Sequence, residues 1–320
     1  MNADDRQGAW QPAMTADHMQ QPTDPLQLSI LYRGPLSSCN YGCDYCPFAK
    51  HAETAAEHET DQQALERFLD WVDARPAHDR IGVFFTPWGE ALIRRRYQQA
   101  LIRLTALPQV TRAAIQTNLS CRLEWVEHCD KDKLALWATY HPSETPRERF
   151  VAKCHDLHRR GVRFSVGAVG LREHADEIEA LRRELPPEVY LWINAYKRLD
   201  GYYHPEDLLR FERVDPLFPL NNTRHPSRGR ACRTGQSVIS VDGEGTMRRC
   251  HFIKAPIGNL YAPDFASVLR ERACGNDTCG CHIGYIHLDH LGLYDVFGDG
   301  VLERIPSVPL WRERALPVLS

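Results

Sequence analysis

Short hydrophobic runs alternate with longer amphipathic stretches between residues 26 and 196. The first run, LQLSILYRG at 26–34, is typical of a buried strand, and the stretch DQQALERFLDWVDARP at 61–76 repeats its hydrophobic residues with helical spacing. The alternation predicts further strands at 81–86, 112–117, 134–140, 162–169 and 188–196, and further helices at 90–107, 123–129, 146–161 and 174–185.

Alternating strands and helices predict an α/β fold with a parallel sheet and helices outside it. An eight-unit barrel of this kind needs about 250 residues, or about 31 per unit. The six units of this chain occupy residues 26–200, so the pattern predicts a partial (β/α)6 barrel. Parallel β/α folds place their chemistry at the carboxyl ends of the strands, which is where the segment after the first strand is expected.

The pattern changes after residue 200. Residues 201–229 are rich in proline and arginine, which indicates a connection, and QSVISVDGEGTMRRCHF predicts a β-hairpin that turns at Asp242–Gly245. We therefore expect a small C-terminal β-hairpin domain over 230–285, followed by a C-terminal extension over 286–320. Residues 1–25 are polar and rich in glutamine and proline, which predicts a flexible leader.

The composition is ordinary for a globular protein, with 43% hydrophobic residues and a net charge of -3. This charge argues against a dedicated nucleic-acid surface, and no run approaches the roughly 18 apolar residues of a membrane span. The N-terminal segment lacks the apolar core of a signal peptide. We expect a cytoplasmic protein without nucleic-acid or membrane partners, whose eleven cysteines are reduced.

Three of these cysteines, Cys39, Cys43 and Cys46, lie in the stretch SSCNYGCDYCPFAK directly after the first predicted strand. A structural zinc site needs four protein ligands. Three thiolates instead hold three irons of a [4Fe–4S] cluster and leave the fourth iron open to a ligand. The alternative is a zinc site that takes a distant fourth ligand.

The CxxxCxxC run, with Tyr45 before its last cysteine, resembles the signature of the radical SAM superfamily. Together with the predicted barrel and a cysteine-rich tail, the resemblance covers roughly residues 26–285. It implies that the open iron binds the amino and carboxylate groups of S-adenosylmethionine, whose reductive cleavage yields a 5′-deoxyadenosyl radical. It also implies hydrogen abstraction from a small-molecule or peptide substrate, and an electron donor such as flavodoxin or ferredoxin.

The segment TPWGE at 86–90 resembles the GGE motif of that superfamily, with Trp88 in place of the first glycine. Gly89 allows close approach of the backbone, and Glu90 is expected to accept a bond from the ammonium of S-adenosylmethionine. The alternative places Glu90 at a helix N-terminus, which its charge also favours. The resemblance further implies contacts with S-adenosylmethionine from residues at or near other strand ends, namely Tyr45, Asn118, Tyr140, His141 and Gly167.

These strand-end residues have other interpretations. His141 and Asn194 could face the substrate instead, and polar strand ends also occur without function. No residue is assigned a catalytic role.

Five further cysteines lie in the tail, at the edges of the predicted hairpin and in the loop ACGNDTCGCHIGY: Cys232, Cys250, Cys274, Cys279 and Cys281. Four of them suffice for a second, auxiliary [4Fe–4S] cluster, and the layout resembles the SPASM/twitch domains of the same superfamily. The compact CGC favours Cys232, Cys250, Cys279 and Cys281, with Cys274 as a replacement for one of that pair. The alternative is a four-cysteine zinc site, which would make the chain a non-catalytic, zinc-stapled binding protein.

Overall fold

The computed structural model describes residues 25–48 and 51–310. The predicted leader up to residue 24 and the end of the predicted extension, residues 311–320, lie outside the described residues. The protein is a mixed α/β structure built around a nine-stranded sheet with the order β10-β9-β8-β1-β2-β3-β4-β5-β6. Strands β1 to β6 pair in parallel and follow the order of the chain, which confirms the predicted parallel sheet.

The strands of this sheet are β1 (Gln27–Arg33), β2 (Arg80–Phe85), β3 (Val110–Thr117), β4 (Leu134–Tyr140), β5 (Arg163–Gly170), β6 (Leu191–Ala195), β8 (Val238–Asp242), β9 (Thr246–Arg248) and β10 (Pro256–Asn259). A separate two-stranded pair consists of β7 (His225–Pro226) and β11 (Thr278–Cys279). The α-helices are α1 (Ala55–Asp73), α2 (Arg95–Ala106), α3 (Arg147–Arg159), α4 (Ala175–Glu184), α5 (Pro205–Val214), α6 (Phe218–Asn221), α7 (His282–Tyr285) and α8 (Leu293–Phe297).

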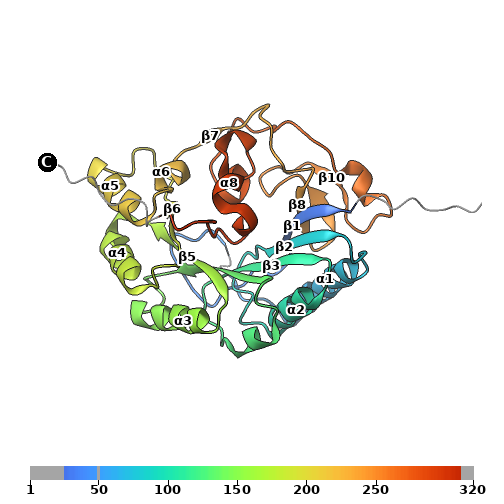
Figure 1. Ribbon diagram of the computed structural model, residues 1–320, viewed down its shortest axis with the longest axis horizontal. Coiled ribbons are helices and arrows are strands. Elements are labelled where there is room, and N and C mark those ends of the chain that lie inside the picture. Colours follow the sequence, from blue (N-terminus) through green and yellow to red (C-terminus); the bar gives the residue numbers. More distant parts are fainter. Residues whose placement is uncertain (1–24, 49–50, 311–320) are drawn as a thin grey trace, which may run out of the picture.

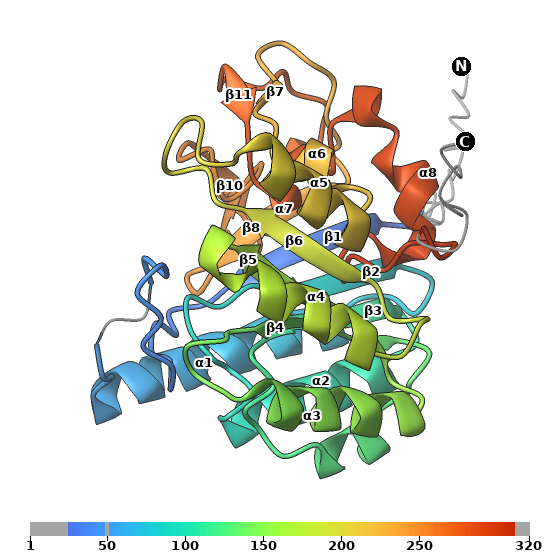
Figure 2. The ribbon, with the colours of Figure 1, turned by 90° about the vertical axis from the view of Figure 1, so that its left-hand side faces the viewer.

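The two faces of the sheet pack against different parts of the chain. Helices α1 to α5 follow one another along the outer side, whereas α8 and the C-terminal segment lie on the inner side (Figure 1). Because side chains alternate along a strand, Ile30 packs in the outer core and its neighbour Leu31 in the inner core. The inner core also contains Val301 and Leu302 of the C-terminal segment. Figure 2 shows the C-terminal elements gathered away from α2 and α3.

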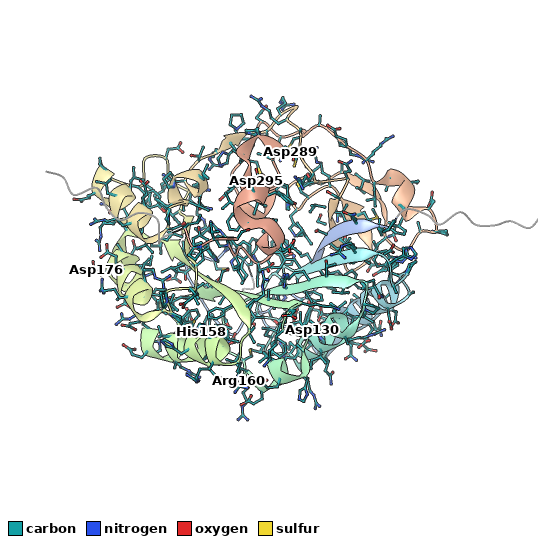
Figure 3. All side chains as sticks on the ribbon, in the orientation of Figure 1. Asp130, His158, Arg160, Asp176, Asp289 and Asp295 are labelled. Atoms are coloured by element: carbon teal, nitrogen blue, oxygen red, sulfur yellow. The ribbon has the colours of Figure 1, made fainter. Side chains whose placement is uncertain are left out.

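The outer helices present charged side chains on the surface of the molecule. Figure 3 shows Asp176 and Arg160 at the rim, on the side of the helices that faces away from the sheet. Within the described residues, every helix is too short or too polar to cross a membrane.

Local chemistry explains where the helices depart from the sequence prediction. Helix α1 begins earlier than predicted because Thr54 caps it, in a reciprocal pair of hydrogen bonds with Glu57. Helix α2 begins only at Arg95. The helix predicted at 123–129 is a five-residue 3₁₀ turn, Glu124–His128.

The predicted connection over 201–229 contains two helices. Helix α5 begins with Pro205, a residue that favours the first helical position. Phe211 and Val214 of α5 are buried against the outer core, so α5 is the helix that follows β6. The predicted hairpin is confirmed as β8 and β9. It does not stand apart from the main sheet, because β8 pairs in parallel with β1.

Candidate functional site

A cavity of about 470 Å³ lies at the carboxyl ends of the parallel strands and on the inner side of the sheet. Its walls come from the loops after β1, β2, β3 and β4, from β5 and β6, and from the tail. The lining residues include Arg33, Cys39, Cys43, Cys46, Trp88, Gly89, Glu90, Asn118, Trp137, His141, Trp192, Asn194, Cys281, His282 and Arg304.

The loop after β1 brings Cys39, Cys43 and Cys46 to this cavity as thiols, none of them in a disulfide. Burial raises the pKa of Cys39, and it raises the pKa of Cys43 to about 11. Cys39 Sγ accepts the backbone N–H of Tyr41 at 3.4 Å. Since buried thiols hold their protons, the thiolates that a metal cluster needs would form only as the metal displaces those protons.

The segment around Gly89 packs directly on the cysteine loop. A side chain at Gly89 would bring its Cβ within 1.8 Å of the Ser38 carbonyl oxygen, so only glycine fits. The neighbouring Trp88 ring lies 4.4 Å from the ring of Phe48 and 4.1 Å below the guanidinium of Arg33. The loops after β1 and β2 therefore form one packed unit at the edge of the cavity.

Glu90 is a buried carboxylate inside this unit. Its oxygens accept bonds from Leu92 N at 2.9 Å, Thr117 Oγ1 at 2.9 Å and Asn118 N at 2.5 Å. Burial raises its pKa to about 7, against the opposing effect of these hydrogen bonds. The alternative of Glu90 at a helix N-terminus is wrong, because α2 begins at Arg95.

His141 and Tyr45 meet on the other side of the cysteine loop. Tyr45 Oη lies 2.7 Å from His141 Nδ1, and Cys43 Sγ lies 3.3 Å from the same nitrogen. Burial lowers the pKa of His141 to about 4, so the ring is neutral at ordinary pH. Asn118 also reaches the loop, and its Nδ2 donates to Asn40 Oδ1 at 3.1 Å.

Two of the residues expected near the cofactor point elsewhere. The Tyr140 ring packs on Phe150 of α3 in the outer core, because residues 139 and 141 take the inner positions of this strand. Gly167 faces inward, but the Trp192 ring lies over it, and an added Cβ would come within 2.1 Å of that ring. Neither Tyr140 nor Gly167 belongs to the described lining of the cavity.

The thiols of the five tail cysteines interact electrostatically with one another. The pKa of Cys279 is raised to about 12, first by burial and then by the neighbouring thiols of Cys250, Cys281 and Cys274. Burial raises the pKa of Cys250, with smaller contributions from Cys232 and Cys274. Cys250 is therefore within electrostatic range of three other tail thiols, and Cys281 lines the cavity.

A zinc ion with bonds of about 2.3 Å needs its sulfurs close to one another. Across residues 25–48 and 51–310, no three His, Cys, Asp or Glu side chains are arranged to hold one ion.

Sequence reasoning missed several residues of the cavity, among them Arg33, Trp192, His282 and Arg304. Arg33 ends β1 and could have been found from that position alone. The others lie in the sheet interior or the tail, and only the three-dimensional fold brings them to the site. Asn194, considered for the substrate, does line the cavity.

No protein-family model and no curated protein matches the chain. Among solved structures, the chain is similar to anSMEcpe with bound AdoMet and Cp18Cys peptide, at 15% identity and a TM-score of 0.47, covering 73% of this chain and 77% of that chain. It is also similar to BtrN in complex with AdoMet and 2-DOIA, at 17% identity and a TM-score of 0.37, covering 77% and 83%. At these values the similarity assigns no activity to this protein.

Proposed function

We propose that the protein is a radical SAM enzyme, with β1 to β6 and their helices as its partial barrel. One observation carries the proposal. The thiols of Cys39, Cys43 and Cys46, from one loop after the first parallel strand, share a cavity with the buried carboxylate of Glu90. This arrangement offers three ligands to an iron–sulfur cluster and an acceptor for an ammonium group beside it.

The residues of the site have distinct roles in this proposal. Cys39, Cys43 and Cys46 would hold three irons of a [4Fe–4S] cluster, and Glu90 would receive the ammonium of S-adenosylmethionine. Bound to that open iron, S-adenosylmethionine would supply the 5′-deoxyadenosyl radical that abstracts hydrogen from a small-molecule or peptide substrate. Trp88 and Phe48 cover one side of the cavity, which would limit the access of water to the reacting groups.

The tail cysteines would hold an auxiliary cluster, which makes the tail a SPASM/twitch-like domain in this proposal. We place Cys250 at the centre of this group of ligands. Cys232 and Cys274 raise the pKa of Cys250, and Cys250 in turn raises the pKa of Cys279. We propose three of Cys232, Cys274, Cys279 and Cys281 as its partners. A reductant of the flavodoxin or ferredoxin class would supply electrons. A zinc-stapled binding protein is not favoured, since the three thiols of the cysteine loop share one cavity with the buried Glu90 carboxylate.

The test is anaerobic reconstitution with iron and sulfide, reduction with dithionite, and addition of S-adenosylmethionine. We expect 5′-deoxyadenosine and methionine in equal amounts, measured by liquid chromatography and mass spectrometry. A protein that carries its iron yet forms no 5′-deoxyadenosine would contradict the proposal. Colourless protein with bound zinc would favour the binding protein instead.

Glu90 gives a prediction that depends on pH. Its pKa of about 7 in the folded protein means that it is mostly protonated at pH 5.5 and mostly ionised above 7. Since an ammonium binds the carboxylate form, S-adenosylmethionine should bind more tightly as pH rises from 5.5 to 7, and binding at pH 6 should release a proton. Glu90→Gln should weaken binding at pH 7 about ten- to a hundred-fold, the value of one charge-assisted hydrogen bond.

Calorimetry in buffers of different ionisation enthalpy measures both quantities. Glu53→Gln is the matched control, because Glu53 bonds Ser37 N and Ser38 Oγ of the same loop from outside the cavity. It should keep the pH dependence. If Glu90→Gln keeps it as well, with the iron content unchanged, Glu90 only holds the loops together.

A further inference from the structure

Arg304 is a buried cation on the inner side of the sheet, with a side chain 1% exposed. The segment that carries it is fixed at the amino ends of the strands, where Ser165 Oγ donates to the Glu303 carbonyl at 2.7 Å. Arg304 itself has a φ of 57°, in the left-handed region that few residues other than glycine adopt. Strained backbone of this kind persists only where the surroundings hold it, and it concentrates at functional sites.

The guanidinium of Arg304 is poorly satisfied by the protein. Among the described residues, its Nε and Nη1 have no hydrogen-bond partner. Its Cζ lies 4.6 Å from the centre of the Trp192 ring and 5.8 Å from that of Trp137. Stacking on indoles favours a cation, but it leaves the N–H donors unused. A buried charge without hydrogen bonds is costly, and natural proteins rarely leave one unless a ligand completes it.

The buried Asp215 carboxylate lies within electrostatic range of Arg304, but no acid bonds its guanidinium directly in the described structure. The Glu303 carboxylate pairs instead with Arg112 at 3.1 Å and Arg163 at 3.2 Å. Asp215 accepts bonds from Tyr190 Oη, Ile193 N and Leu217 N, and no ion pair within 4 Å joins it to Arg304 in the described structure. The adjacent His282 Nε2 is also buried without a partner.

Arg304 and His282 line the same cavity as the cysteine loop, and Asn194 lines it level with His141 by the register of β4, β5 and β6. The distance between Arg304 and the cysteine loop can be estimated along β4 and the residue that follows it. Trp137 lies beside Arg304, and His141 lies beside Cys43. The four residue steps from Trp137 to His141 span about 13 Å at about 3.3 Å per residue. A molecule of moderate size can therefore contact Arg304 with one end and face the cysteine loop with the other.

We infer that Arg304 binds the carboxylate of the substrate through its unpartnered N–H groups, with His282 Nε2 as a neighbouring polar contact. A guanidinium matches a carboxylate with two parallel hydrogen bonds. A ligand with a single negative charge is expected, because only one arginine of the described cavity lining is available to bind it. The other, Arg33, already donates to the Thr86 carbonyl and stacks on Trp88. This inference rests on the proposed function only in naming the bound molecule a substrate.

The test measures binding of small probes to the anaerobically reconstituted protein by calorimetry. Benzoate carries a carboxylate on an aromatic ring suited to the indole walls, benzamide is its neutral isostere, and phenylphosphonate is the phosphate analogue. We expect benzoate to bind at least about tenfold more tightly than benzamide, as expected for a charge-assisted pair. Arg304→Met should remove this preference, and Arg304→Lys should keep part of it.

Arg163→Met is the matched control, because Arg163 pairs with Glu303 in the same segment but does not line the cavity. It should keep the preference for benzoate. Equal binding of benzoate and benzamide to the unaltered protein would overturn the inference, whether or not any variant folds. Tighter binding of phenylphosphonate would overturn the carboxylate assignment.

A preference for benzoate that survives in Arg304→Met would place the site elsewhere and would also overturn the inference. Formation of 5′-deoxyadenosine is measured separately, so failure of the radical SAM proposal and failure of the carboxylate site give different results.

Discussion

Cys43→Ala is expected to abolish the cleavage of S-adenosylmethionine completely. The loop after β1 contributes three thiols to the cavity, and a [4Fe–4S] cluster with one open iron uses all three. Loss of Cys43 leaves two ligands, so the cluster that binds S-adenosylmethionine should not assemble. The measurement is 5′-deoxyadenosine formed by the reduced, reconstituted variant beside the unaltered protein.

Cys154→Ala is the control for this experiment. Cys154 is a fully buried thiol of α3 in the outer core, away from the cavity. Its loss removes a sulfur without removing a proposed ligand, and cleavage should persist. Cleavage by Cys43→Ala at an appreciable fraction of the rate of the unaltered protein would show that the open iron is held elsewhere.

Cys250→Ala is expected to remove the second cluster and leave the first. The unaltered protein should contain about eight irons per chain, and this variant about four, those held by Cys39, Cys43 and Cys46. It should still form 5′-deoxyadenosine without substrate, because only the first cluster has an open iron. Metal binding also contributes folding energy, so the iron count is made on protein that remains monodisperse.

The iron contents of the Cys43→Ala and Cys250→Ala variants serve as controls for each other. Cys43→Ala should keep about four irons of its own, those of the tail. If the unaltered protein holds about four irons together with stoichiometric zinc, the auxiliary cluster is wrong and the tail is a zinc site. If Cys250→Ala loses all of its iron and all cleavage, the two cysteine groups do not act independently.

Periodicity was sufficient to predict the parallel sheet, because each strand is buried on both faces and reads as a continuous hydrophobic run. The cysteine loop and Glu90 could be placed for the same reason, since both follow predicted strands. The direction in which each side chain points was harder to predict from the sequence. Tyr140 and His141 are adjacent in sequence, yet only His141 lines the cavity.

Long-range contacts escaped prediction altogether. Nothing local distinguishes Arg304 from the other arginines near the C-terminal end, and its role depends on Trp137 and Trp192, far away in sequence. The pairing of β8 with β1 was missed for a similar reason. A hairpin pattern predicts its own turn and two strands, but it contains no information on which sheet edge the strands will join.

The C-terminal segment on the inner side of the sheet also has a consequence for biosynthesis. Residues 301–305 leave the ribosome after every strand that they cover, at roughly 5–20 residues per second. Until they arrive, Leu31, Trp137 and Trp192 lack the partners of their inner core. The nascent sheet thus has an unfinished inner face, and contacts so distant in sequence form late. The cavity is complete only after this segment has been translated, and insertion of the proposed cluster would follow that step.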